Sequence, residues 1–135
     1  MKWNKKFSYK KSIRSIINNS RHYSINQEKL PSVSAILEIT KPIKDKEALK
    51  NWENKIGKIE ARRVSNESMS LGNAMHLYIQ NFLENRLNGE FLAEENLGKK
   101  MAEEIIENGL KNNLSEIYGV EACLYYPNYF AGTCD

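Results

Sequence analysis

Residues 120–135, VEACLYYPNYFAGTCD, decide the fold of this chain. Residues 120–126 are rich in the β-branched and aromatic side chains that strands favour. Pro127-Asn128 is typical of a turn, and residues 129–134 form a second short strand-like run. The stretch therefore predicts a β-hairpin.

The register of this hairpin follows if Asn128 lies at the centre of a three-residue loop. Tyr126 then faces Phe130, and Glu121 faces Asp135. Because side chains alternate between the two faces of a strand, the two carboxylates would lie side by side on one face. Like charges that face each other repel, so such a pair needs a cation or a proton. We therefore predict that the two acids form a candidate site for a hard metal ion.

Length and composition indicate one soluble domain of 135 residues. No apolar run approaches the roughly 20 residues that a membrane span needs. The basic N-terminus lacks the apolar region of a secretory signal, although a start without an acid before Glu28 leaves an organellar transit peptide as an alternative. Cys123 and Cys134 fall on opposite hairpin faces, so we expect no disulfide between them. These features predict a cytoplasmic protein that does not enter a membrane.

The net charge of +3 conceals a strong asymmetry along the chain. Residues 1–63 hold 16 Lys and Arg against 6 Asp and Glu, whereas residues 64–135 hold 4 against 11. A nuclease would show this pattern, with one part binding phosphate and another binding metal. Two oppositely charged solvated surfaces would show it as well.

The first 28 residues are interpreted as a basic arm. Its cations alternate with four aromatic residues, Trp3, Phe7, Tyr9 and Tyr23. Cations offset phosphate charge, and aromatic faces stack on unpaired bases. The alternative is a poorly ordered tail whose few isoleucines dock on the core.

Five helical segments are expected between this arm and the hairpin. Ser32 is a good N-cap for a short helix that ends at Lys41-Pro42. Asp45 is a candidate N-cap for a second helix, which ends at Gly57.

The other three segments follow from apolar residues at helical spacing. A third helix is predicted at about residues 58–71, where Gly72 breaks the pattern. A fourth begins close by and stops at Asn88-Gly89, and a fifth covers residues 96–114. A lone hairpin is marginal in water, so its strands must pack on these helices or gain further strands.

Several short motifs, taken in order, resemble a known family. Residues 72–76 (GNAMH), Val120-Glu121 and residues 131–135 (AGTCD) resemble the G-x-x-x-H, E and G-x-x-D elements of RecB-type PD-(D/E)XK nucleases. Residues 30–37 (LPSVSAIL), the spacing of Leu49, Trp52 and Gly57, and residues 71–79 are similar to phage exonucleases related to the mitochondrial genome maintenance exonuclease. The resemblance covers about residues 21–135.

The resemblance implies an α/β, restriction-endonuclease-like fold, of which residues 29–135 would be the N-terminal part. A mostly helical region would precede the hairpin, which would start the catalytic sheet. In that family the sheet continues into a strand carrying D/E-x-K, and this sequence stops at Asp135. Leu71 and Asn73 stand where relatives often carry Arg and Thr.

The site that the resemblance implies is a metal centre for phosphodiester hydrolysis. Asp135 would bridge the metal ions, and Glu121 would bind a metal ion or orient its ligands. His76 would supply a nitrogen ligand or hold the scissile phosphate. Mg²⁺ (or Mn²⁺) suits these oxygen ligands. Contacts to nucleic acid are expected from five residues on the preceding segments: Ser32, Ser34, Arg62, Arg63 and Asn73. Taken alone, a histidine or a surface arginine in these places is more often a packing or solvated residue.

The sequence thus predicts a metal-dependent exonuclease for single-stranded DNA in the cytoplasm, including that of a phage-infected host. Without the D/E-x-K strand, the chain alone is expected to be inactive. Two alternatives keep a role in nucleic-acid binding: a non-catalytic remnant, and a split-enzyme subunit whose missing part a second chain supplies. A plain helical interaction module is the third alternative.

Overall fold

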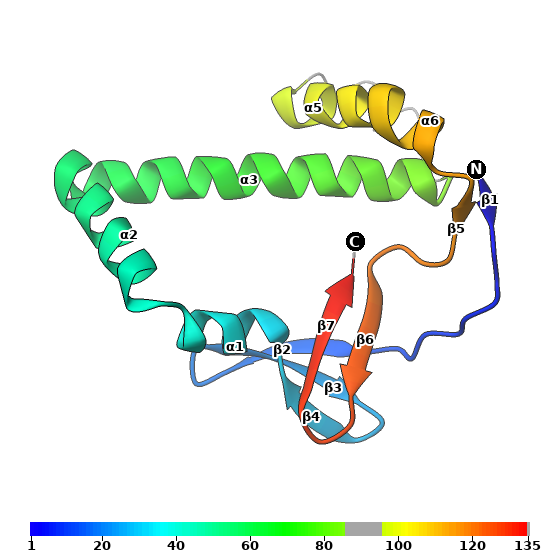
Figure 1. Ribbon diagram of the computed structural model, residues 1–135, viewed down its shortest axis with the longest axis horizontal. Coiled ribbons are helices and arrows are strands. Elements are labelled where there is room, and N and C mark those ends of the chain that lie inside the picture. Colours follow the sequence, from blue (N-terminus) through cyan, green and yellow to red (C-terminus); the bar gives the residue numbers. More distant parts are fainter. Residues whose placement is uncertain (86–95, 135) are drawn as a thin grey trace. The chain divides into compact units, whose positions relative to one another are not determined.

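The computed structural model describes residues 1–85 and 96–134 and has a mixed α/β fold with small sheets. The chain divides into two compact units (elements labelled in Figure 1). The first, here called the helical unit, comprises Met1–Asn4 and Leu49–Val120. The second, the hairpin unit, comprises Lys5–Ala48 and Glu121–Asp135. The expected α/β class is confirmed, whereas the restriction-endonuclease-like core stays a prediction.

The hairpin unit begins with a three-stranded antiparallel sheet. Its strands are β2 (Ile13–Ile17), β3 (Ser20–Ile25) and β4 (Glu28–Pro31). Two-residue turns join them at Asn18-Asn19 and Asn26-Gln27, and all four turn residues have positive φ, between 48° and 71°. Asparagine tolerates this left-handed conformation, which matches the twist of paired strands. Much of the segment interpreted as a basic arm is therefore a folded sheet.

The hairpin predicted at the end of the sequence is present. Strands β6 (Ala122–Tyr126) and β7 (Phe130–Cys134) pair in the predicted register, from Tyr126↔Phe130 to Ala122↔Cys134. The turn spans residues 127–129, and Asn128 at its centre has a φ of 66°. The three-residue loop is thus confirmed.

Both parts of the hairpin unit contribute to one buried core. Tyr23, Ile25 and Leu30 come from the sheet, and Cys123 and Ala131 come from the hairpin. Burying a side chain such as leucine stabilises a fold by about 1.5–3 kcal/mol. This core therefore holds the hairpin against the sheet.

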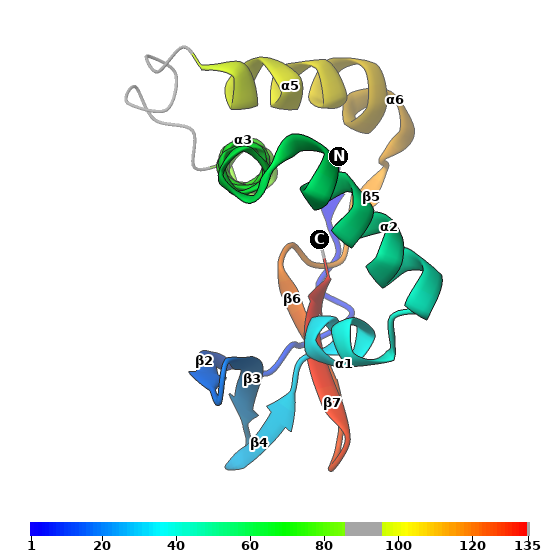
Figure 2. The ribbon, with the colours of Figure 1, turned by 90° about the vertical axis from the view of Figure 1, so that its left-hand side faces the viewer.

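Helix α1 (Val33–Thr40) follows β4 and lies beside β7 (Figure 2). Ser32 caps it as predicted, since the Ser32 Oγ accepts a hydrogen bond from the Ala35 amide at 3.0 Å. The helix ends before Lys41, also as predicted. Val33 packs close to Gly132, where an added Cβ would lie 3.3 Å from the Val33 Cγ2.

Helix α2 (Ile43–Ile56) runs from the hairpin unit into the helical unit. It begins two residues before Asp45, so the prediction of Asp45 as N-cap is wrong. Asp45 lies in the first turn instead, where a carboxylate interacts favourably with the exposed amides of the helix. The helix ends before Gly57, as predicted, and the φ of 86° at Gly57 separates it from the next helix.

The helical unit is built around α3 (Lys58–Leu83), a single helix of 26 residues. The predicted break at Gly72 is wrong, because α3 passes through this residue without interruption. A glycine inside a helix costs only about 1 kcal/mol relative to alanine, which the apolar packing of Met75, Tyr78 and Ile79 after it offsets. The predicted stop at Asn88-Gly89 lies outside the described residues, and α3 ends at Leu83.

The expected fifth helical segment forms α5 (Leu97–Ile105), a π-helical turn η1 (Ile106–Leu110) and α6 (Lys111–Asn113). It runs alongside α3 (Figure 1). Gly98 allows this approach, since a Cβ added there would lie only 2.8 Å from the Ala74 Cβ. Buried Tyr78, Ala102 and Ile106 form the core between the helices.

The start of the chain also belongs to the helical unit. Strand β1 (Lys2–Trp3) pairs in parallel with β5 (Glu116–Ile117). Asn4 donates a hydrogen bond to the Glu116 carboxylate at 2.8 Å, and Trp3 donates one to the Leu83 carbonyl at 3.2 Å. No helix among the described residues has the length and apolarity to cross a membrane.

Candidate functional site

The structure describes two of the three predicted metal ligands, and these two belong to different units. His76 lies on α3 in the helical unit and is exposed. Glu121 lies in the hairpin unit immediately before β6 and is half-buried, whereas Asp135 lies outside the described residues. Within residues 1–85 and 96–134, no three His, Cys, Asp or Glu side chains form a group that could hold a metal ion. A common metal for the three ligands therefore stays a prediction.

Glu121 leads the chain into β6 in an unusual backbone conformation. Its φ is 49°, a left-handed value that is uncommon for a residue other than glycine. The strand pairing recorded for the hairpin stops at Ala122↔Cys134. The predicted facing of Glu121 and Asp135 would be the next pair and lies outside the described residues.

The two serines proposed for nucleic-acid contact have different environments. Ser32 is only 1% exposed. Its Oγ caps α1, and its amide donates to the Arg21 carbonyl at 2.9 Å. Ser34 is exposed. The structure thus gives Ser32 a role in ending β4 and starting α1, and leaves Ser34 accessible to a ligand.

The two arginines proposed for phosphate contact lie exposed on α3 and differ in their pairing. Arg63 bonds to Glu60 at 2.6 Å and to Glu67 at 2.5 Å. Hydrogen bonds to the two carboxylates raise the pKa of Arg63, and the bond to Arg63 lowers the pKa of Glu60. Arg62 makes no ion pair with any described residue. Local acids therefore already neutralise the charge of Arg63.

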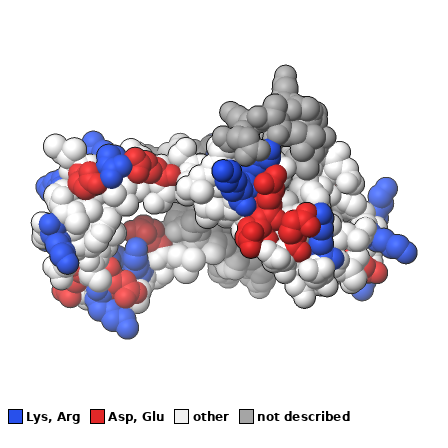
Figure 3. Space-filling view, turned by 90° about the horizontal axis from the view of Figure 1, so that it is seen from above, with Lys and Arg blue, Asp and Glu red and all other residues white. Residues whose placement is uncertain are grey.

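Charge pairing within helices recurs along the helical unit. Lys99 lies 3.9 Å from Glu103, and Lys111 is paired with Glu107, each four residues apart. In the view of Figure 3, basic and acidic side chains lie next to one another instead of forming separate patches. Side chains at this spacing are neighbours on a helix, so their charges offset each other locally.

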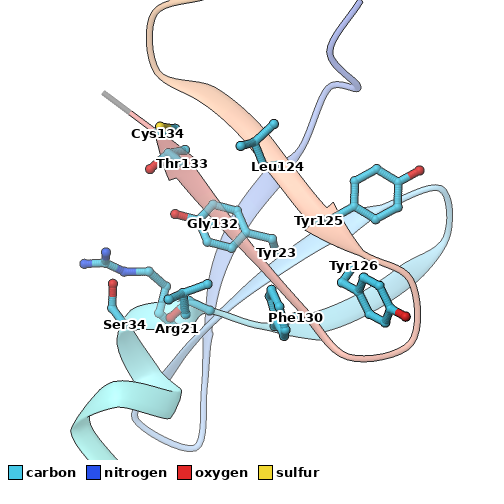
Figure 4. A pocket seen from close by; sticks show the side chains of 12 residues that line it. Arg21, Tyr23, Ser34, Leu124, Tyr125, Tyr126, Phe130, Gly132, Thr133 and Cys134 are labelled. Carbon is cyan, nitrogen blue, oxygen red and sulfur yellow. The ribbon is translucent and has the colours of Figure 1, made fainter.

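The hairpin unit contains a pocket of about 480 Å³ that the sequence did not indicate. We call it the hairpin pocket. It lies between the outer face of the hairpin and the start of α1, and Figure 4 shows Arg21 at one end, Tyr126 at the other and Phe130 between them. Its lining combines this cation with hydroxyl groups and aromatic rings, including Ser34, Tyr23 and Tyr125.

A second pocket, of about 590 Å³, lies on the other side of β6. We call it the arm pocket, because residues 6–10 of the N-terminal segment line it together with Cys123, Leu124 and Tyr125. The Lys6 Nζ lies 5.4 Å from the centre of the Phe7 ring, a cation–π contact. Leu124 and Tyr125 line both pockets, so the two adjoin along β6.

Sequence reasoning missed the hairpin pocket because it missed the β2–β4 sheet. The paired Asn18-Asn19 between two strand-like runs was the available signal, since such dipeptides favour two-residue turns. In that sheet, alternation would place Arg21 and Tyr23 on one face of β3. Comparisons of this chain with protein-family models, with curated proteins and with solved structures found no match.

Proposed function

We propose that this chain supplies metal ligands to a metal-dependent exonuclease of the PD-(D/E)XK type that acts on single-stranded DNA. The collinear G-x-x-x-H, E and G-x-x-D elements support the proposal, with His76, Glu121 and Asp135 as ligands. From this likeness in sequence we also infer the activity, the DNA substrate and the metal ion, which would be Mg²⁺ or Mn²⁺.

The observation that carries the proposal is the register of the β6–β7 hairpin. Five consecutive pairs follow it, ending at Ala122↔Cys134. The described ladder ends before Glu121, whose backbone is left-handed (φ 49°). If Glu121 became extended, the same register would make Glu121 and Asp135 opposite neighbours. Directly opposite residues of an antiparallel pair have Cβ atoms about 4.5–5.5 Å apart. Two carboxylates at that distance favour a shared cation.

The chemical roles follow from what phosphodiester hydrolysis requires. A bound Mg²⁺ would polarise the phosphate and lower the pKa of the attacking water. Asp135 and Glu121 would hold the ion, and His76 would add a ligand or contact the phosphate. The D/E-x-K element of the family does not follow Asp135 in these 135 residues. We therefore assign metal binding to these three ligands. Complete catalysis would also need the groups of the D/E-x-K element.

Manganese titration tests the proposed metal site. Mn²⁺ binding is followed by electron paramagnetic resonance, where bound and free ions differ in signal. Removing one ligand carboxylate in Glu121→Gln or Asp135→Asn should weaken binding about tenfold or more, because few ligands hold the ion. Glu38→Gln, an exposed acid on α1, is the matched control and should bind like the parent. Equal binding by all four proteins would refute the proposed site.

A nuclease assay tests the division between binding and catalysis. A purified protein of these 135 residues should leave single-stranded DNA intact in Mg²⁺, because they do not include the D/E-x-K lysine that would stabilise the developing charge. Digestion that needs Mg²⁺ and is lost in Asp135→Ala would show that these residues suffice for catalysis.

Binding of nucleic acid without catalysis is the second candidate function. The two pockets favour it, since they join cations to aromatic rings and need no metal. It predicts DNA binding that weakens steeply with salt and is indifferent to both Mg²⁺ and Asp135→Ala. A helical interaction module would bind no DNA even at low salt.

A further inference from the structure

We infer that the hairpin pocket and the arm pocket are adjoining subsites for consecutive nucleotides of a single DNA strand that crosses β6. Tyr126 and Phe130 stack on a base, and Arg21 contacts a phosphate. The inference rests on the proposed function for the identity of the strand as DNA. It goes beyond that function by assigning the strand's path to the hairpin unit and to residues outside the proposed metal site.

The aromatic part of the hairpin pocket is available to a ligand. Tyr126 and Phe130 are opposite each other in the hairpin, with ring centres 6.0 Å apart and planes inclined by 24°. They remain 58% and 41% exposed, on the face opposite the buried Ala131. Large rings left open on an outer sheet face offer a flat apolar surface. A base stacks on such a surface regardless of its identity.

The charge of both pockets suits an anionic ligand. Arg21 lines the hairpin pocket, and Lys6 and Lys10 line the arm pocket. No Asp or Glu among the described residues lines either pocket. Arg21 and Lys10 make no ion pair with a described residue, in contrast to Arg63. Their charge is therefore available to a phosphate.

The arrangement of the pockets favours a chain over a small molecule. Each has a volume within the usual range of about 300–1,000 Å³ for ligand sites. They share Leu124 and Tyr125, so a ligand filling both must pass over β6. Repetition of cation and aromatic ring in adjoining sites matches the repetition of phosphate and base along a strand. A duplex cannot use them in this way, because its bases are stacked within the helix.

The test is fluorescence anisotropy of a labelled oligothymidine of about ten nucleotides, measured in EDTA with the full chain. Losing one stacking ring in Tyr126→Leu or Phe130→Leu should weaken binding about fivefold to a hundredfold. Arg21→Gln should reduce the slope of log affinity against log salt by about 0.7, the value for one phosphate contact on a single strand. Two variants are matched controls: Tyr118→Leu, an exposed aromatic of the helical unit, and Lys44→Gln, an exposed cation on α2 in the hairpin unit. Both should bind like the parent within about twofold.

Competition separates a strand from a free nucleotide. Unlabelled oligothymidine should displace the probe at far lower concentration than thymidine monophosphate or inorganic phosphate. Preference for the monophosphate would overturn the inference in favour of a single-nucleotide site. Equal affinity for duplex DNA, or unchanged binding by the Tyr126 and Phe130 variants, would also overturn it.

The result is independent of the proposed metal site, because EDTA removes divalent ions. Loss of Mn²⁺ binding in Asp135→Asn with normal oligothymidine binding would support both proposals. Absence of any Mn²⁺ site with intact pocket-dependent binding would refute the metal proposal alone. Intact Mn²⁺ binding with pocket variants that bind DNA normally would refute the strand path alone.

Discussion

The two units of this chain use their cations in opposite ways. In the helical unit, Arg63 is held between Glu60 and Glu67, and its charge is offset on α3 itself. In the hairpin unit, Arg21 lines a pocket without a described carboxylate. Both side chains are exposed arginines. Exposure and residue type therefore do not distinguish an arginine that is paired locally from one that is not, whereas the positions of the nearest acids do.

The two units also differ in the internal contacts that stabilise each of them. The core of the hairpin unit joins Leu30 to Ala131, residues far apart in sequence. The core of the helical unit joins α3 to α5, which follows it in the sequence, and ion pairs between residues three or four apart add to it. We therefore expect buried contacts to dominate stability in both units, and helix spacing and local charge to add a smaller contribution in the helical unit.

The largest expected effect comes from the core of the hairpin unit. Leu30→Ala removes a side chain that is 3% exposed and should lower the free energy of unfolding by about 2–5 kcal/mol. Leu37→Ala on α1 is the matched control, since Leu37 is 62% exposed, and should change it by less than about 0.5 kcal/mol. Urea unfolding followed by circular dichroism measures both. Equal losses would mean that the core is not where the structure places it.

The contact between α3 and α5 should give the next largest effect. Gly98→Ala places a Cβ 2.8 Å from that of Ala74, so the helices must separate, at about 1–3 kcal/mol. Gly72→Ala meets nothing within 4 Å and should instead stabilise the protein by about 0.5–1 kcal/mol. Thermal unfolding of the two variants distinguishes them by opposite signs. A stabilised Gly98→Ala protein would contradict the close approach.

The cap of α1 should contribute less. Ser32→Ala removes the hydroxyl that accepts from the Ala35 amide and should lower stability by about 0.5–2 kcal/mol. Ser32→Asp should retain most of the stability, because a carboxylate also caps a helix. Ser34→Ala, at an exposed position, should be close to neutral. Chemical denaturation measures the free energy of unfolding of each variant. An equal loss of stability in Ser34→Ala and Ser32→Ala would argue against the cap.

The hydrogen-bonded carboxylates of the helical unit predict a small effect of pH on the free energy of unfolding. Hydrogen bonds from Arg63 to Glu60 and from Asn4 and Tyr118 to Glu116 lower the pKa of each carboxyl below its usual 4.5. The stabilisation is complete above that value and is lost as the pH falls through each lowered pKa. Urea midpoints between neutral pH and pH 3 measure the loss. Glu116→Gln should flatten the dependence, and an unchanged slope would show that Glu116 is not involved.

Local signals in the sequence predicted part of this fold well. The hairpin register followed from Asn128 at the centre of a three-residue loop, and Ser32 was identified as a cap from its position before an apolar helical face. The break at Gly72 was wrong because a propensity of about 1 kcal/mol does not outweigh the packing of a long helix. Local preference decides turns and caps, where few tertiary contacts compete.

The features that the sequence did not predict depend on contacts between distant segments of the chain. The basic residues of the first 28 positions indicate an arm, although residues 20–25 form strand β3. Arg21 and Phe130 line one pocket only because the sheet and the hairpin share a core, which no short sequence pattern reveals. The three metal ligands follow from the resemblance in sequence, and their convergence on one ion is a prediction.

Iron-dependent cleavage of the backbone tests most directly whether one ion joins the proposed ligands. Fe²⁺ replaces Mg²⁺ at oxygen-rich sites and, with ascorbate and peroxide, produces hydroxyl radicals that cut the chain close to the ion. We predict cuts near His76, near Glu121 and near Asp135, suppressed together by excess Mg²⁺ and lost in Asp135→Asn. Cuts near the hairpin without any near His76 would remove the histidine from the site. The absence of Mg²⁺-sensitive cuts at all three positions would contradict the metal centre.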